Sequence, residues 1–247
     1  MRMRKKPNLG NRMERCAALL IREPEARRGR WRELMPDARE LRLEIGCGKG
    51  RFTAETAARN PDCLFVAIER VADAMIIAME RARDRGLQNL RFIDGDAARL
   101  GEMFAPGEVD RIYINFCDPW PKSRDAKFRL TYPGFLRSYA VLLPVGGQIH
   151  FKTDNLPLFQ WSIEQMERED WALSEVTNDL HADGGDFFMT DYEAKFTAEG
   201  LKINRLVATK TVATLDTSAP PLERMRGAAL TDARGYEESM RAREEQA

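Results

Sequence analysis

Apolar segments of strand length alternate with amphipathic segments of helix length from residue 41 onward. Short apolar runs predict five strands, at 41–45, 63–68, 90–93, 109–116 and 148–152. Between them, helical spacing of apolar residues predicts helices at 51–59, 71–85, 135–143 and 156–168. This alternation is typical of a parallel sheet, because parallel strands are joined by crossover helices that cover both faces of the sheet.

The last part of the alternating region differs from the rest. Two further strands are predicted at 172–180 and 203–212, and no crossover helix is predicted between them. They are expected to form an antiparallel hairpin at one edge. The predicted fold is therefore α/β, a doubly wound, mostly parallel seven-stranded sheet with helices on both faces and an antiparallel edge hairpin.

The two ends of the chain differ from this core. Residues 1–12 contain five basic side chains and no acidic one, which is typical either of a solvated terminus or of an arm that lies on phosphate. A helix is predicted over 13–35, and residues 216–247 alternate in charge without an apolar pattern. The predicted organisation is a basic arm and helix (1–36), the core (37–215) and a polar tail (216–247).

Composition excludes several classes of protein. Hydrophobic residues make up 43% of the 247, enough for a core, and 39 basic residues balance 39 acidic ones. No apolar run approaches the ~18 residues of a membrane helix, and none resembles the core of a signal peptide. The four cysteines and two histidines have no metal-ligand spacing, so we expect reduced thiols, no metal and a cytoplasmic location.

The first predicted strand ends in a glycine-rich turn. Glu44 is followed by Gly46, Gly48 and Gly50, a spacing that differs from the dinucleotide pattern GxGxxG. Glycines at these positions permit a tight turn and let a ligand approach the backbone closely. The alternative is an ordinary turn between a strand and a helix.

Carboxylates follow the next two strands. Glu69 ends the second strand, where it can accept both hydroxyls of a ribose. Asp96 follows the third, where it can accept the exocyclic amine of an adenine, and Glu44 can face a cationic amino-acid group. The glycine turn has only Lys49 against these three acids, which disfavours a phosphate ligand. A cationic nucleoside without phosphates fits better, and S-adenosylmethionine is such a molecule.

A second set of candidate residues follows the fourth strand. The run 115–122, NFCDPWPK, places Asp118 and Trp120 on a turn made rigid by two prolines. Such a turn can hold a flat base, or it can be a stiff loop around a core tryptophan. Residues 122–129, KSRDAKFR, carry four basic side chains and one acid, typical of a solvated face or of a phosphate-binding segment.

Two polar runs close this set. Residues 152–155, KTDN, and 190–193, TDYE, are functional candidates because polar clusters at strand ends lie on the ligand side of such a sheet. His150 alternates with apolar neighbours and is interpreted as structural, whereas His181 has no predicted role.

Four motifs in order carry a family resemblance. LEIGCGKG, NFxDPWPK, HFKTDN and TxYExKF resemble the bacterial tRNA (guanine-N7)-methyltransferase family over residues 1–212, including the MRMRKKP start. The resemblance implies the class I S-adenosylmethionine-dependent methyltransferase fold, with 37–215 as its domain, and methylation of N7 of a variable-loop guanosine in tRNA. It places Glu44, Glu69, Asp96 and Asp118 around S-adenosylmethionine, with Asp118 also at the catalytic position.

The resemblance also implies a substrate side. It places six residues at the substrate, namely Lys122, Asp154, Thr190, Asp191, Tyr192 and Glu193. It places Arg124, Lys127 and Arg129 against RNA, with tRNA as partner, S-adenosylhomocysteine as product and no metal. The sequence departs from the family pattern at Cys117, where proline or serine is usual, and in the basic run, which Ser123, Asp125 and Phe128 dilute.

Other functions stay open at this point. A methyltransferase acting on another base or a small molecule would share the fold, but the basic run and the KTDN and TDYE runs favour tRNA. A non-catalytic tRNA-binding protein would lack a reason to keep both Asp118 and the glycine turn. The glycine spacing disfavours an NAD-dependent oxidoreductase. The sequence does not indicate whether the chain is a monomer or a homodimer.

Overall fold

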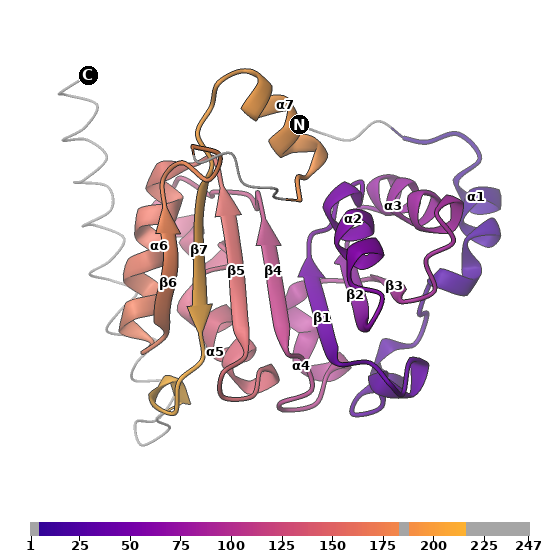
Figure 1. The fold of residues 1–247 in the computed structure, drawn as a ribbon, viewed down its shortest axis with the longest axis horizontal. Helices are drawn as coiled ribbons and strands as arrows, with labels where there is room; N and C mark the ends of the chain where they lie inside the picture. The colour runs from indigo at the N-terminus through magenta and orange to yellow at the C-terminus, as the bar shows by residue number, and fades with distance from the viewer. Residues whose placement is uncertain (1–4, 183–187, 216–247) are drawn as a thin grey trace.

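The computed structural model describes residues 5–182 and 188–215, which are built on one seven-stranded sheet (Figure 1). The strands run in the order β3-β2-β1-β4-β5-β7-β6. Their bounds are β1 (Glu40–Ile45), β2 (Cys63–Glu69), β3 (Leu90–Asp94), β4 (Arg111–Asn115), β5 (Gln148–Thr153), β6 (Ala172–Thr177) and β7 (Asn204–Thr209). The first five strands are parallel, and β7 pairs antiparallel with both β5 and β6. The predicted fold class is confirmed.

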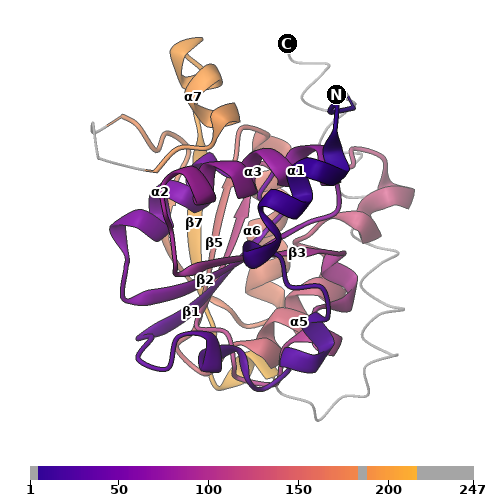
Figure 2. The same cartoon turned by 90° about the vertical axis from the view of Figure 1, so that its right-hand side faces the viewer.

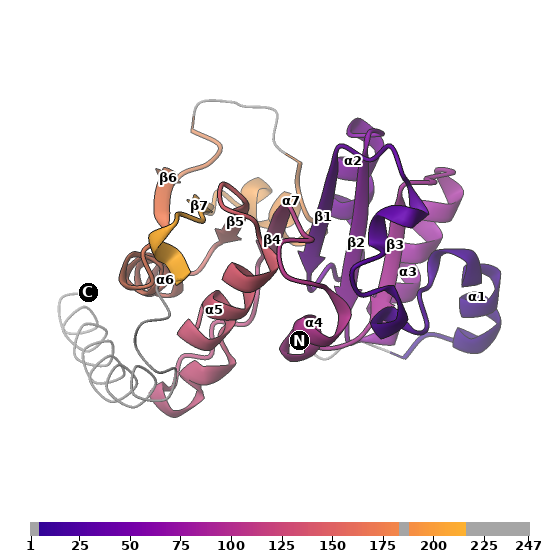
Figure 3. The ribbon, with the colours of Figure 1, turned by 90° about the horizontal axis from the view of Figure 1, so that it is seen from below.

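Helices cover both faces of the sheet. Their bounds are α1 (Leu9–Arg15), α2 (Arg51–Arg59), α3 (Ala72–Asp84), α4 (Leu100–Met103), α5 (Pro133–Leu142), α6 (Leu156–Arg168) and α7 (Asp191–Ala198). Helices α4, α5 and α6 lie on one face, and α2 and α3 lie on the other (Figure 3). None of the helices in the described ranges is long and apolar enough to cross a membrane.

Burial explains the strand patterns. Every residue of β2 from Cys63 to Ile68 is buried, because helices cover both sides of this interior strand. Burial on both sides favours a continuous apolar run in the sequence. The edge strand β6 has mostly exposed residues. The hairpin prediction is confirmed in its pairing, but the β6–β7 connection contains α7, which the polar sequence of that segment did not predict.

The helix predicted over 13–35 is wrong. The structure has α1 and then three short 3-10 turns, at Ala17–Leu19, Pro24–Arg27 and Trp31–Leu34. Pro24 cannot donate a backbone hydrogen bond, and Gly29 adopts a φ of 76°, so a continuous helix cannot form here. Instead the Ile21 amide donates to the Phe92 carbonyl of β3 at 2.9 Å.

The segment before β1 packs onto the same core as the sheet. Helix α1 lies against α3 (Figure 2), where Arg12 makes an ion pair with Glu80. The Trp31 side chain is fully buried, stacks on Phe104 at 4.9 Å and donates from Nε1 to the Met103 carbonyl at 2.8 Å. Residues 16–36 therefore contribute to the core, whereas the predicted tail, 216–247, lies outside the described residues.

Candidate functional site

The predicted site residues gather where the parallel strands end. The glycine turn follows β1, Glu69 ends β2, Asp96 follows β3, Asp118 follows β4 and Asp154 follows β5. Helix α7 lies at this same end of the sheet, toward which β4 and β5 point (Figure 1). In open α/β sheets this edge is where ligands bind.

The glycine turn has a backbone that other residues adopt only at a cost. Gly46, Gly48 and Gly50 all have positive φ values, of 76°, 56° and 69°. At Gly50 the reason is also steric, because a Cβ there would lie 2.4 Å from the Ala78 Cβ of α3. The start of α2 therefore packs closely against α3. Helix α2 begins directly after the turn, with the Ala54 amide donating to the Gly50 carbonyl at 3.0 Å.

Glu44 is a buried carboxylate just before this turn. It is 2% exposed and accepts hydrogen bonds from the Thr53 hydroxyl and, at 3.0 Å, from Asn115 Nδ2. Burial raises the pKa of Glu44 to about 7, although the bonds from Thr53 and Asn115 oppose the rise. The Glu44 carboxyl group can therefore release its proton when a cationic ligand binds beside it.

Glu69 braces the glycine turn. Its two carboxylate oxygens accept from the Gly48 amide and the Val71 amide, each at 2.9 Å. These bonds fix the carboxylate at the end of β2, and each oxygen keeps a lone pair for a further donor. Asp96 is exposed and caps the 3-10 turn at Ala97–Arg99 by accepting from the Ala98 amide at 2.9 Å.

The loop after β4 is strained at two aromatic residues. Phe116 and Trp120 have φ values of 53° and 45°, a region that bulky side chains rarely occupy. Asp118 lies between them and is exposed, with no hydrogen-bond partner among the described residues. Strain of this kind persists only where the surroundings impose it, and it gathers at functional sites.

Arg129 is one of the groups that impose this loop shape. It is 1% exposed, and its guanidinium donates to the Pro119 carbonyl at 3.0 Å and to the Trp120 carbonyl at 2.9 Å. It also stacks on Trp161 at 4.4 Å. The structure contradicts the prediction that Arg129 contacts RNA, because the side chain is buried beneath the loop that it holds.

The rest of the basic run lies at the surface. Lys122, Arg124 and Lys127 are exposed. Lys122 precedes a 3-10 turn at Ser123–Phe128, and the other two lie within it. Phe128 is 49% exposed and contacts Trp120 at 5.2 Å between ring centroids. Exposed cations beside exposed rings are typical of surfaces that bind RNA.

Tyr192 joins three elements at the edge of the sheet. Its hydroxyl donates to Asp154 Oδ2 at 3.3 Å, and its ring lies 5.3 Å from Phe116 and 4.1 Å from Phe196. Burial and the neighbouring Asp154 raise the pKa of Tyr192, which keeps the hydroxyl protonated as a donor. The predicted residues Asp154 and Tyr192 are thus brought together beside the Asp118 loop.

Glu193 is buried, unlike Tyr192, which precedes it in the chain. It is fully buried and accepts from Lys152 Nζ at 2.6 Å, and its other oxygen lies 3.1 Å from His181 Nε2. It also completes a capping box with Thr190 at the start of α7. The structure contradicts direct substrate contact by Glu193, because its carboxylate is enclosed by protein groups.

Asp191 is engaged as well. It forms a two-pronged ion pair with Arg81 of α3, with N···O distances of 2.7 and 3.0 Å. Helix α7 is therefore held to β5 through Glu193 and to α3 through Asp191. Thr190 and Asp191 were predicted at the substrate, and in the structure both also fix the start of α7.

Sequence reasoning missed three residues of this arrangement. Lys152 lies within the predicted KTDN run, but only Asp154 was singled out there. A signal was present, because Lys152 is a charged residue within a predicted strand, directly after Phe151. His181 and Arg81 carried no local signal, since their partners lie 12 and 110 residues further along the chain.

Metal-ligating side chains do not cluster in this part of the chain. Among the described residues, no group of three or more His, Cys, Asp or Glu is arranged to hold a metal ion. The four cysteines are free, and three of them are buried.

Comparison with known proteins decides the family. A family model described as "Putative methyltransferase" matches residues 38–206. A tRNA (guanine-N(7)-)-methyltransferase of Bacillus cytotoxicus is 41% identical over 211 residues, which cover 84% of this chain and 96% of that protein. The chain belongs to the tRNA (guanine-N7)-methyltransferase family. The resemblance given by the four motifs is confirmed.

Solved structures share the fold of this family member at low identity. A 16S rRNA methyltransferase, KamB, is 17% identical with a TM-score of 0.57, covering 74% of this chain and 92% of that one. An antibiotic-related methyltransferase is 18% identical with a TM-score of 0.56, covering 73% and 92%. These likenesses concern the fold alone, and they agree with the mostly parallel sheet described above.

The raised pKa of Glu44 predicts how stability depends on pH. Between pH 4.5 and about 7 the folded protein keeps a proton on Glu44 that the unfolded chain releases. The free energy of unfolding contributed by this group therefore falls as pH rises, by at most about 1.4 kcal/mol per pH unit, and levels off above the folded pKa.

Chemical denaturation of the wild type and of Glu44→Gln across this pH range measures the effect. The difference in unfolding free energy, wild type minus variant, should fall with rising pH, since contributions of other groups cancel. Parallel profiles for the two proteins would contradict the raised pKa.

Proposed function

We propose that this chain transfers a methyl group from S-adenosylmethionine to N7 of a variable-loop guanosine in tRNA, giving 7-methylguanosine and S-adenosylhomocysteine. The observation that carries the proposal is Asp118, an exposed carboxylate without a hydrogen-bond partner among the described residues, on a strained loop. The Asp118 loop lies between the glycine turn and the Tyr192 ring, which contacts Phe116. The chain is also a member of the tRNA (guanine-N7)-methyltransferase family.

The residues present suit the cofactor. A turn of glycines without Cβ atoms leaves room for a ligand against the backbone, and Glu69 is fixed beside it to accept ribose hydroxyls. We assign Asp96 to the adenine amine and Glu44 to the side of the cationic amino-acid group. S-adenosylmethionine supplies a methyl group on a positively charged sulfur.

The chain's contribution to the reaction is position and charge. Guanine N7 carries a free lone pair at neutral pH, so no side chain has to remove a proton. Asp118 accepts guanine N–H groups, orients N7 and stabilises the positive charge that appears on the purine. Arg129 donates to the carbonyls of Pro119 and Trp120, and these hydrogen bonds hold the loop that positions Asp118.

The tRNA is held by the exposed part of the basic run. Lys122, Arg124 and Lys127 contact phosphates, and Trp120 and Phe128 offer ring faces to bases. We place Asp154 and Tyr192 beside the guanine once it turns out of the tRNA, because the Tyr192 ring contacts Phe116 at the start of the Asp118 loop.

Asp118→Asn tests the catalytic assignment. The amide keeps the size of the side chain but removes the negative charge, so turnover should fall by about 100-fold or more while the fold is unchanged. The measurement is nucleoside mass spectrometry of unmodified tRNA incubated with protein and S-adenosylmethionine, with thermal unfolding alongside.

Asp84→Asn is the matched control, since Asp84 is an exposed aspartate at the end of α3 and should leave turnover unchanged. Near wild-type turnover in Asp118→Asn would overturn the role of Asp118. A different methylated nucleoside in the wild type would overturn the choice of atom.

The basic run predicts a salt effect on tRNA binding. Replacing Arg124 and Lys127 together by glutamine removes two phosphate contacts, so the slope of log K against log salt should become shallower by about 1.5. Filter binding at several salt concentrations measures this slope.

Arg30→Gln is the control, because Arg30 is exposed near the opposite ends of the strands and should leave the slope unchanged. An unchanged slope in the double variant would show that these two cations do not bind the tRNA.

A further inference from the structure

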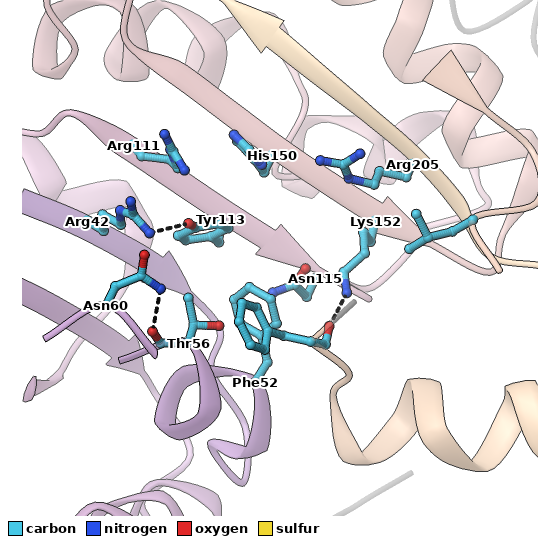
Figure 4. A pocket seen from close by; sticks show the side chains of 12 residues that line it. Arg42, Phe52, Thr56, Asn60, Arg111, Tyr113, Asn115, His150, Lys152 and Arg205 are labelled. Carbon is cyan, nitrogen blue, oxygen red and sulfur yellow. Dashed lines mark hydrogen bonds between the residues drawn. The ribbon is translucent and has the colours of Figure 1, made fainter. Parts of the chain in front are cut away.

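One face of the sheet carries a cavity, apart from the residues assigned above to methyl transfer. Helices α2 and α3 cover β1, β2 and β3 on this face, whereas polar side chains from β4, β5 and β7 point into a cavity of about 270 Å³ (Figure 4). The residues Glu69, Asp96 and Asp118 do not line it. The cavity extends along the length of the strands, rather than lying at the edge where they end.

The cavity is lined by cations. Arg42, Arg111, Lys152 and Arg205 all line it, and none of the described lining residues is a carboxylate. Their acidic partners lie outside the lining. Glu40 pairs with Arg42 at 2.6 Å and lies 3.7 Å from Arg111, so one carboxylate serves two guanidinium groups.

The other two cations are also paired with carboxylates outside the lining. Glu193 pairs with Lys152, and Glu175 pairs with Arg205. Among the described residues, the cavity therefore presents four cationic side chains and no carboxylate on its walls. The pKa of His150, which also lines the cavity, is lowered to about 3, first by burial and then by the charges of Arg111 and Arg205.

Two buried donors at the cavity have no partner. Thr56 Oγ1 and Arg111 Nε are both shielded from solvent and make no hydrogen bond with the described residues. Such unpaired atoms are rare, and these two lie within the wall of the cavity rather than on its open surface.

The cavity also has aromatic walls. Phe52, Tyr113 and Phe188 line it, with Phe52 edge-on to Tyr113 at 5.1 Å and to Phe188 at 6.4 Å. Its volume is nearly twice the ~150 Å³ of an apolar cavity that binds benzene. A ring of base size and a phosphate-sized group therefore fit together.

We propose that this cavity binds a nucleoside monophosphate unit, with the phosphate at Arg111 and Arg205, which flank His150, and the base against the aromatic walls. The unit can come from a free nucleotide or from an RNA strand, since both present the same chemistry. The cations and the rings carry this assignment, which does not rest on the proposed methyl transfer.

The histidines provide a direct readout on the full chain. There are only two, and only His150 lines the cavity, so the ring signals in a ¹H–¹³C NMR spectrum are assigned with one variant, His181→Gln. The probe is cytidine 5′-monophosphate, because its base is not the guanine assigned to Asp118. Its addition to the wild type should shift the His150 signals in a saturable way. Cytidine alone and inorganic phosphate alone should bind more weakly than the intact nucleotide.

Variants locate the site by calorimetry with the same nucleotide. Arg111→Gln and Arg205→Gln should each weaken binding by about tenfold or more. Arg83→Gln on α3 is the matched control, and Asp118→Asn should also bind the nucleotide like the wild type. Thermal unfolding confirms that each variant is folded.

The outcomes separate the two sources. Displacement of the nucleotide by tRNA assigns the cavity to an RNA strand, and independent binding of both assigns it to a free nucleotide. The proposal is overturned if neither nucleotide nor tRNA shifts the His150 signals, or if Arg111→Gln and Arg205→Gln leave the affinity unchanged. Loss of methyl transfer in Asp118→Asn with intact nucleotide binding would distinguish failure of one site from failure of the other.

Discussion

The buried ion pair between Lys152 of β5 and Glu193 of α7 is the interaction on which the ligand side of the molecule depends. Both side chains are almost fully enclosed, and Lys152 Nζ lies 2.6 Å from Glu193 Oε2 and 2.8 Å from the Phe188 carbonyl. A charged pair removed from water is stable only when each partner is satisfied, so this contact fixes where α7 lies. The position of Tyr192 follows from it, because Tyr192 is the neighbour of Glu193 on that helix.

Both proposed sites lie near this pair. On the edge of the sheet, α7 brings Tyr192 against Phe116 and Asp154, beside the strained loop that carries Asp118. On the face of the sheet, Lys152 is one of the cations that line the cavity. Lys152 therefore both fixes the position of α7 and lines the cavity.

Local patterns predicted much of the fold and where the glycine turn and Glu69 lie in it. Helix α6 was predicted over 156–168 and has these bounds, because its apolar spacing and the Asn155 cap are both local signals. The positions of the glycine turn and of Glu69 at the ends of β1 and β2 were likewise readable from local sequence. The continuous helix over 13–35 failed because Pro24 and Gly29 interrupt it, and because Ile21 bonds instead to Phe92, far along the chain. Arg129 and Glu193 were placed at a ligand by the family resemblance. Their burial depends on partners that no sequence window contains, the carbonyls of a folded loop and Lys152.

A double-mutant cycle on the free energy of unfolding tests the central claim most directly. Lys152→Met leaves Glu193 buried without its lysine, and Glu193→Gln leaves Lys152 buried without its carboxylate, so each should cost about 3–5 kcal/mol. The amide introduced by Glu193→Gln keeps the size of the side chain and an oxygen for the cap of α7. The double variant should therefore be destabilised by much less than the sum of the two single variants. Losses that simply add, or single variants as stable as the wild type, would contradict the account.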